Sequence, residues 1–176
     1  MSLYWKNLRA AIAAGFISAM LPQALAAQNQ GASLCKNQEE PIFACTLKKQ
    51  RAVAVCASQP PGGHQGYLQY RFGKPGNLEI NVPDKADSSN WREQFKAKRL
   101  WYSAGGGNYL RVDHGPYAYV VFSAFGRWGD KDGVMVWKDG AMVAHHACAG
   151  PALSRLGPDL QSRLGIEEDP EELTLP

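Results

Sequence analysis

Residues 117–125 are apolar at both odd and even positions, apart from Ser123. Successive side chains of a strand point to opposite faces, so a strand of this kind must be covered above and below. The run therefore predicts a central strand of a β-sandwich or β-barrel. The segment before it, 109–112, alternates polar and apolar residues, and turn formers at 113–116 separate the two, which predicts a hairpin.

In this hairpin we expect Val112 to face Tyr117 and Tyr109 to face Val120. The register gives an inner set, Leu110, Val112, Tyr117, Tyr119 and Val121, and a second set, Tyr109, Val120, Phe122 and Arg111. The apolar residues of the second set need a cover, which another sheet, the C-terminal segment of the chain or a partner could supply.

Three further pairs of segments have the alternation and the turn residues of hairpins. They are 42–47 with 51–56, 68–72 with 78–82 across Gly73–Asn77, and 134–137 with 142–148 across Asp139–Gly140. In the second pair, Arg71 and Glu79 fall on the outward face and could pair there. A short helix is expected from Asn90 to about Lys98, and a long polar loop over 126–133.

Together these elements predict an all-β fold, an antiparallel barrel or sandwich of about eight or nine strands with a short C-terminal helix. The helix is expected within 159–166, with Leu160, Leu164 and Ile166 turned inward, where it could cover the second face.

The start of the chain has the form of an export signal. Lys6 and Arg9 precede an apolar run over 10–21, and small residues at 24–26 suit a cleavage site. The apolar run is shorter than the ~20 residues of a membrane span, so a periplasmic or secreted protein is expected. The predicted organisation is a signal peptide (1–26), a flexible N-terminus (27–34), a β domain (35–150) and a short helix with an acidic tail (151–176).

The chain has four cysteines, and an even number in an exported protein predicts disulfides. In the first hairpin Cys45 shares a face with Val53 and Val55, whereas Cys56 lies on the other face, so a direct Cys45–Cys56 bridge is disfavoured. Two pairings remain open, Cys35–Cys45 with Cys56–Cys148, or Cys35–Cys56 with Cys45–Cys148.

Charge argues against nucleic-acid binding. The predicted leader holds two of the 19 basic residues and none of the 16 acidic ones, which leaves 17 against 16 and a net charge of +1. Lys96, Lys98 and Arg99, beside Trp91 and Trp101, are interpreted as a solvated face next to core aromatics.

Five acidic residues without a basic one lie near the C-terminus, at Glu167, Glu168, Asp169, Glu171 and Glu172. We interpret this tail as a solvated, disordered segment. The alternative is that the tail folds back on the domain and shields a basic surface.

The candidate binding residues are Trp128 and Arg127, together with Tyr109 and Arg111 on the second face. A large aromatic residue flanked by glycines and charges in a loop is a reasonable recognition residue. The alternative for Trp128 is that its ring plugs one end of the fold.

No motif predicts catalysis, a metal site or a cofactor. Ser103 and Ser123 lie in no nucleophile motif, and Asp113–His114 suits a turn. The cysteines lack C-x-x-C spacing, and the adjacent His145 and His146 point to opposite faces in a strand.

The segments 66–73, 43–45, 53–56, 105–111, 119–121 and 148–150 resemble a group of small exported bacterial proteins to which no activity is assigned. A weaker likeness is to the periplasmic inhibitors of C-type lysozyme, small exported β-barrels in which Cys45 and Cys148 would have counterparts. The expected function is non-enzymatic binding of a protein or a cell-wall glycan in the bacterial envelope. The alternatives are a lysozyme-inhibitor-like protein and an envelope hydrolase of unrecognised type.

Overall fold

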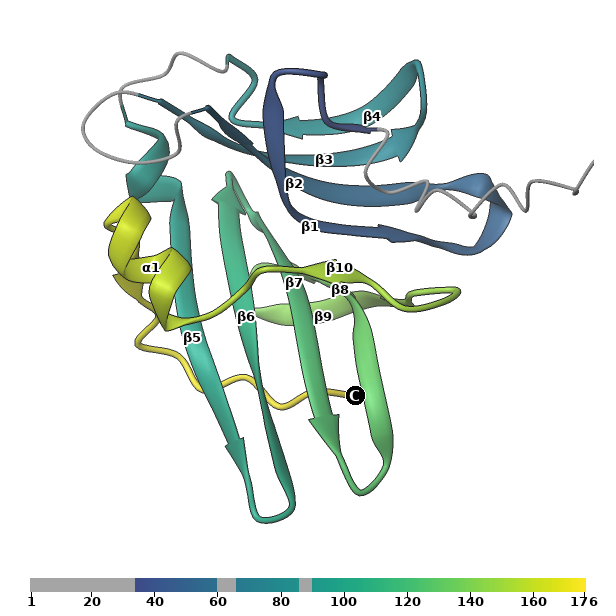
Figure 1. Ribbon diagram of the computed structural model, residues 1–176, viewed down its shortest axis with the longest axis vertical. Coiled ribbons are helices and arrows are strands. Elements are labelled where there is room, and N and C mark those ends of the chain that lie inside the picture. The colour runs from purple at the N-terminus through teal and green to yellow at the C-terminus, as the bar shows by residue number, and fades with distance from the viewer. Residues whose placement is uncertain (1–33, 60–65, 86–89) are drawn as a thin grey trace, which may run out of the picture.

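In the computed structural model, which describes residues 34–59, 66–85 and 90–176, the chain forms two β-sheets (Figure 1). The predicted export signal, 1–26, lies outside the described residues. The first sheet has the order β10-β1-β2-β3-β4, with β1 (Glu39–Thr46), β2 (Ala52–Ser58), β3 (Leu68–Lys74), β4 (Asn77–Val82) and the short β10 (Leu153–Ser154).

The second sheet has the order β11-β5-β6-β7-β8-β9. Its strands are β5 (Phe95–Tyr102), β6 (Gly105–His114), β7 (Tyr117–Gly126), β8 (Gly129–Lys138), β9 (Ala141–Ala147) and the short β11 (Glu167–Glu168). Two 3₁₀ turns, η2 (Lys48–Gln50) and η3 (Trp91–Gln94), and the helix α1 (Pro158–Leu164) complete the elements. No helix among the described residues has the length and apolar character that a membrane span requires.

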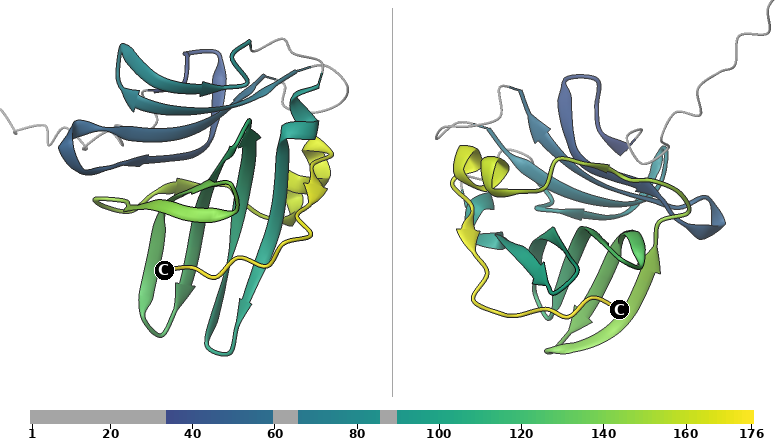
Figure 2. Two further views of the ribbon diagram at one scale, coloured as in Figure 1. Left: turned by 180° about the vertical axis from the view of Figure 1, so that it is seen from behind. Right: turned by 60° about the horizontal axis from the view of Figure 1, so that its bottom comes forward.

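The two sheets form an open sandwich and do not close into a barrel. Strands of the first sheet run across those of the second and cover one end of its inner face (Figures 1 and 2). The core between them is apolar from both sides, and the ring of Tyr70 in β3 stacks on that of Tyr119 in β7 at a centroid distance of 5.0 Å. The prediction of an all-β fold with a short C-terminal helix is confirmed.

The central hairpin keeps the predicted faces but not the predicted pairs. Val112 pairs with Tyr119 and Tyr109 with Phe122, two residues away from the expected register. The strands continue to a Tyr117–His114 pair, so the turn contains only 115–116. A shift of two residues leaves every side chain on the same face, which is why the inner and second sets were predicted correctly.

Two other local predictions are wrong. The expected loop over 126–133 is a continuation of the β7–β8 hairpin, with Arg127 and Trp128 in the turn between the paired Gly126 and Gly129. The expected helix from Asn90 reduces to the 3₁₀ turn η3, because Phe95 and the residues after it pair along β6 as strand β5. Tertiary pairing overrides local helical propensity in that segment.

The disulfides are Cys35–Cys56 and Cys45–Cys148, one of the two pairings that the sequence left open. In the β1–β2 ladder Cys45 pairs with Val53, and Cys56 lies in a separate small cluster on the outer face of the first sheet. The disfavoured Cys45–Cys56 bridge is therefore absent from the structure. The Cys45–Cys148 bridge joins β1 to the residue that follows β9.

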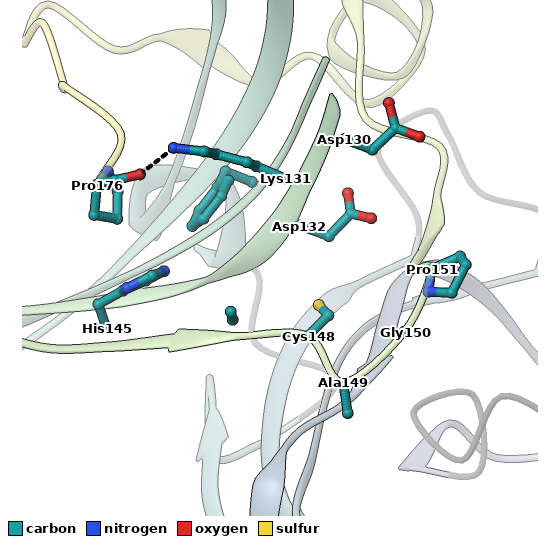
Figure 3. Close-up of a pocket in the computed structure, with 11 residues that line it drawn as sticks. Asp130, Lys131, Asp132, His145, Cys148, Ala149, Gly150, Pro151 and Pro176 are labelled. Atoms are coloured by element: carbon teal, nitrogen blue, oxygen red, sulfur yellow. Dashed lines mark hydrogen bonds between the residues drawn. The ribbon is translucent and has the colours of Figure 1, made fainter. Parts of the chain in front are cut away.

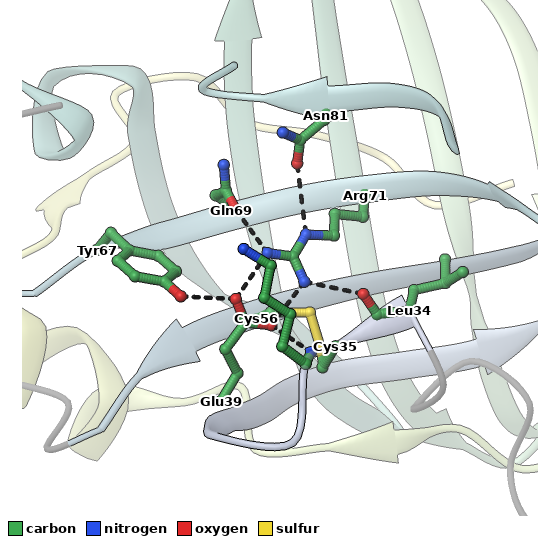
Figure 4. Close-up of a disulfide and its surroundings, with 9 residues drawn as sticks. Leu34, Cys35, Glu39, Cys56, Tyr67, Gln69, Arg71 and Asn81 are labelled. Atoms are coloured by element: carbon green, nitrogen blue, oxygen red, sulfur yellow. Dashed lines mark hydrogen bonds and ion pairs between the residues drawn. A yellow bond between two sulfur atoms is a disulfide. The ribbon is translucent and has the colours of Figure 1, made fainter. Parts of the chain in front are cut away.

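Arg71 is buried and pairs with Glu39, which corrects the predicted Arg71–Glu79 pair (Figure 4). Its Nη1 and Nη2 donate to the two carboxylate oxygens of Glu39 at 2.6 and 2.7 Å, and Nη1 also donates to the Leu34 carbonyl at 2.8 Å. The segment around Leu34 and Cys35 covers this part of the outer face, a contact that strand alternation alone does not reveal. Glu79 pairs instead with the exposed Arg51 at 3.0 Å.

The carboxylate of Glu39 also accepts a hydrogen bond from the Tyr67 hydroxyl at 2.6 Å. Burial alone would raise the pKa of Glu39, but the hydrogen bonds from Arg71 and Tyr67 outweigh it and lower the pKa below 4.5. Burial, followed by the bond to Glu39, raises the pKa of Tyr67 to about 12. A lowered carboxyl pKa stabilises the fold above pH 4.5, and this contribution is lost as the pH falls through the lowered value.

We predict that Arg71→Leu lowers the free energy of unfolding by about 3–5 kcal/mol at pH 7, because it leaves a buried carboxylate without a counter-charge. Arg51→Leu removes an exposed pair and is the matched control, with an expected loss of about 0–1 kcal/mol. Denaturant unfolding with both disulfides intact measures the two values. Equal losses in both variants would contradict this account of the Arg71–Glu39 pair.

Candidate functional site

The end of the second sheet away from the first sheet, which we call the open end, is made by the β5–β6 and β7–β8 hairpins (Figures 1 and 2). Its inner face continues the face that forms the sandwich core, but no strand of the first sheet covers it. Trp101 and Phe125 lie on this part of the inner face and are 72% and 62% exposed. The prediction of Trp101 as a core aromatic and of Phe125 in a covered strand is therefore wrong, since both side chains are exposed.

Strand pairing places Trp101 and Phe125 in one row across the sheet. Trp101 pairs with Gly106, and Gly106 pairs with Phe125, so a glycine lies between the two aromatic residues. The next row toward the core is polar and consists of Arg99, Asn108, Ser123 and Asp132. Neighbouring strands are ~4.8 Å apart, so the two aromatic residues start from backbones ~10 Å apart.

Of the three glycines at 105–107, Gly106 lies on the inner face between Trp101 and Phe125, and Gly105 and Gly107 lie on the outer face. A Cβ on Gly105 or Gly107 would lie 2.0 or 2.6 Å from a backbone oxygen of β7, so any larger residue would push the strands apart. A Cβ on Gly106 would lie 3.1 Å from the Leu100 oxygen and 3.8 Å from Cζ of Phe125. Because residue 106 has no side chain, the backbone of β6 is exposed beside the Phe125 ring and forms the base of a hollow.

This hollow, over the glycines of β6, has a volume of about 470 Å³. Trp101, Asn108 and Phe125 line it from the sheet, and the segment Arg155–Leu160 lines it from the side. The guanidinium of Arg99 lies 3.8 Å from the centre of the Trp101 ring, which holds a positive charge against one face of the indole. The hollow therefore offers apolar rings, the positive charge of Arg99, the amide of Asn108 and the carboxylate of Asp159 within one surface.

The predicted recognition residues Trp128 and Arg127 occupy the β7–β8 turn at the same end of the sheet. Trp128 is 46% exposed and its ring meets Tyr102 edge-on at 5.4 Å. A Cβ on Gly126 would lie 2.5 Å from the indole, so the glycine makes room for the ring. Trp128 thus packs partly on its own hairpin, and Arg127 is exposed beside it.

Tyr109 and Arg111, the other predicted binding residues, lie on the outer face of the second sheet beneath the acidic tail. Tyr109 is buried, and its hydroxyl lies 3.0 Å from the Asp169 carboxylate. Arg111 donates to Glu171 at 2.5 Å and to Asp113 at 2.8 Å. The four predicted residues therefore form two separate pairs, Arg127 and Trp128 in the turn at the open end and Tyr109 and Arg111 beneath the tail.

The preferred interpretation of the tail as a disordered segment is wrong, and the alternative of a folded-back tail is what the structure shows. Leu173 and Leu175 pack on the second apolar cluster, which contains Leu100, Tyr109, Val120, Phe122 and Met135. The tail, and not α1, covers the second face, because Leu160 and Leu164 of α1 belong to the sandwich core. Apolar residues at alternate positions after the acidic run were the signal for this contact.

A second hollow, of about 560 Å³, lies at the edge of β8 where β9 ends (Figure 3). Two of its charged groups have partners: Lys131 Nζ donates to the Pro176 oxygen at 2.8 Å, and Asp132 accepts from the Ala152 amide at 3.1 Å. Burial lowers the pKa of His145 in its wall, and the charges of His146 and Lys131 add to the effect. This hollow is larger than the one at the open end, but it exposes no aromatic ring of comparable size.

The residues weighed for catalysis are not brought together. His114 pairs with Tyr117 at the covered end of β7, whereas Ser123 lies about 20 Å further along that strand. Ser103 lies in the β5–β6 turn at the open end, and Asp113 binds Arg111. Among the described residues, the one cluster with metal-ligand spacing contains Cys35, Cys56 and Glu39, but its sulfurs form a disulfide and its carboxylate binds Arg71.

Trp101 and Phe125 were not proposed as site residues from the sequence. A signal for them exists, because Trp101 shares the alternation of Phe95 and Ala97 and faces a run of three glycines across the hairpin. Comparison with protein families, with curated proteins and with solved structures found no match for this chain.

Proposed function

We propose that this protein is an exported, non-enzymatic binding protein of the bacterial cell envelope, and that it binds a glycan chain in the hollow at the open end. The observation that carries the proposal is the pair of exposed rings, Trp101 and Phe125, on either side of Gly106. Large apolar side chains exposed in a concave surface commonly mark a ligand site.

The chemistry of the hollow suits a sugar ring. One face of a sugar presents C–H groups that pack on an aromatic ring, and its edge presents hydroxyls that need hydrogen-bond partners. Trp101 and Phe125 supply the rings, and Asn108 supplies an amide within the same hollow. Arg99, held against Trp101, adds a donor for an acidic substituent of the chain.

A second candidate function is inhibition of a C-type lysozyme. It is favoured by the Cys45–Cys148 bridge, which joins the two cysteines that have counterparts in the likeness to that inhibitor family. An inhibitor would block lysis of a cell-wall suspension at stoichiometric amounts. Unchanged lysis at an excess of this protein would remove the second candidate and leave glycan binding intact.

We predict that Trp101→Ala and Phe125→Ala each weaken binding to insoluble peptidoglycan by about tenfold, because each removes a ring that stacks on the ligand. Co-sedimentation with a concentration series of purified peptidoglycan measures the effect. Leu78→Ala is the matched control, since Leu78 is an exposed apolar residue of the first sheet, away from the hollow. Equal binding by all four proteins would contradict the proposed site.

Trp128→Ala tests the residue that the sequence favoured. If the hollow binds the ligand, this substitution lowers binding less than Trp101→Ala, because the Trp128 ring packs against Tyr102 outside the hollow. A larger loss with Trp128→Ala than with Trp101→Ala would move the site to the β7–β8 turn.

A further inference from the structure

The C-terminal tail, residues 167–176, lies as an extended segment on the outer face of the second sheet (Figures 1 and 2). It begins with β11, which pairs in parallel with β5 through Glu167–Lys96 and Glu168–Ala97. It then crosses the sheet and reaches β8, where Lys131 binds the Pro176 oxygen. After β11 the tail is no longer a strand of the sheet, and it contacts the sheet through alternate side chains and through single hydrogen bonds to its backbone.

Alternate side chains of the tail face the sheet. Asp169 is fully buried, Glu171 binds Arg111, and Leu173 and Leu175 pack on the second apolar cluster. The intervening Pro170, Glu172 and Thr174 are exposed, and Glu171 is also largely exposed although its carboxylate binds Arg111. The segment therefore presents a spaced pattern of four residues, two acidic and then two apolar, to the sheet.

The body of the protein provides a matching set of groups. The Tyr109 hydroxyl lies 3.0 Å from both the Asp169 carboxylate and the Glu171 carbonyl oxygen, and Arg111 Nη1 lies 3.8 Å from Asp169 and 2.5 Å from Glu171. The Tyr109–Asp169 contact is buried, whereas the Arg111–Glu171 pair lies at the solvent-exposed edge of the tail. Hydrogen bonds to a carboxylate are stronger than those between neutral groups, so these contacts favour acidic residues at the two positions.

Other groups hold the tail backbone without regard to its sequence. Lys98 Nζ donates to the Glu171 carbonyl at 3.2 Å, and the Asp169 amide donates to the Ala97 carbonyl at 3.0 Å. Backbone contacts that give affinity, combined with alternate side chains that give selectivity, characterise grooves that bind extended peptides.

We propose that the outer face of the second sheet is a peptide-binding groove, which the tail occupies as an intramolecular competitor. Its partner is an extended acidic protein segment with the spacing acid-x-acid-x-Leu-x-Leu. The proposal does not depend on glycan binding at the open end, because the hollow lies on the inner face of the sheet.

Because the tail is covalently attached to the domain, a free peptide has to compete with it for the groove. A segment tethered to its own site acts at an effective concentration of about 1 mM, so a free peptide of equal affinity competes poorly with it. Weakening the tail without changing the groove removes this competition and raises the apparent affinity for an added peptide.

The test uses a labelled synthetic peptide with the sequence of residues 167–176 and the full-length chain, with fluorescence anisotropy as the readout. In the chain, Asp169→Asn with Glu171→Gln loosens the tail, because these carboxylates contact Tyr109 and Arg111. Glu168→Gln with Glu172→Gln is the matched control, since it makes the same change in charge at exposed side chains. We expect the peptide to bind the loosened chain at least about tenfold more tightly than the wild-type or control chain.

Specificity is tested on both partners. A peptide that carries the Asp169→Asn and Glu171→Gln changes is expected to lose binding, and so is the loosened chain after Arg111→Ala. Concentration-dependent dimers of the loosened chain that Arg111→Ala abolishes would also support the groove, because a tail from a second copy would then occupy it.

The proposal is overturned if the peptide binds all three chains equally, or if binding survives Arg111→Ala. A second loosened chain, Leu173→Ser with Leu175→Ser, covers the case in which the first does not fold, as judged by its thermal unfolding. Absence of peptide binding to a loosened chain that folds, with release of its tail shown by hydrogen exchange, also overturns the proposal.

Discussion

A sheet that is apolar on both faces has to be covered twice, and this requirement organises the molecule. The inner face of the second sheet carries Val112, Tyr119 and Val121, and the first sheet covers it. The outer face carries Tyr109 and Phe122, and the tail covers it. The described part of the chain has only two sheets, so the acidic segment after α1 completes the fold although its composition suits solvent.

The two proposed binding surfaces lie back to back on the same strands. In β5, Trp101 faces the hollow at the open end while its neighbour Leu100 contacts the apolar cluster beneath the tail. In β6, Asn108 lines the hollow while its neighbour Tyr109 belongs to the cluster beneath the tail. Successive residues of one strand therefore serve opposite surfaces, so a displacement of either strand alters both.

Local alternation was sufficient to predict the fold class, the faces of the central hairpin and the Asp139–Gly140 turn, because these follow from the two-residue period of a strand. It could not identify contacts between segments far apart in sequence. Arg71 was assigned to the wrong partner because its cover, the segment at Leu34, lies outside the hairpin pattern. Trp101 was missed for a related reason: whether an inward-facing residue is buried depends on how far the opposing sheet extends.

The Cys45–Cys148 bridge spans a sequence separation of 103 residues, whereas the Cys35–Cys56 bridge spans only 21. In synthesis from the N-terminus, Cys35 and Cys56 therefore become available long before Cys148, the partner of Cys45. Mispairing with Cys56 during this interval is opposed by the β1–β2 ladder, which turns the two side chains to opposite faces. The geometry of the β1–β2 hairpin thus disfavours a Cys45–Cys56 bridge before Cys148 is available.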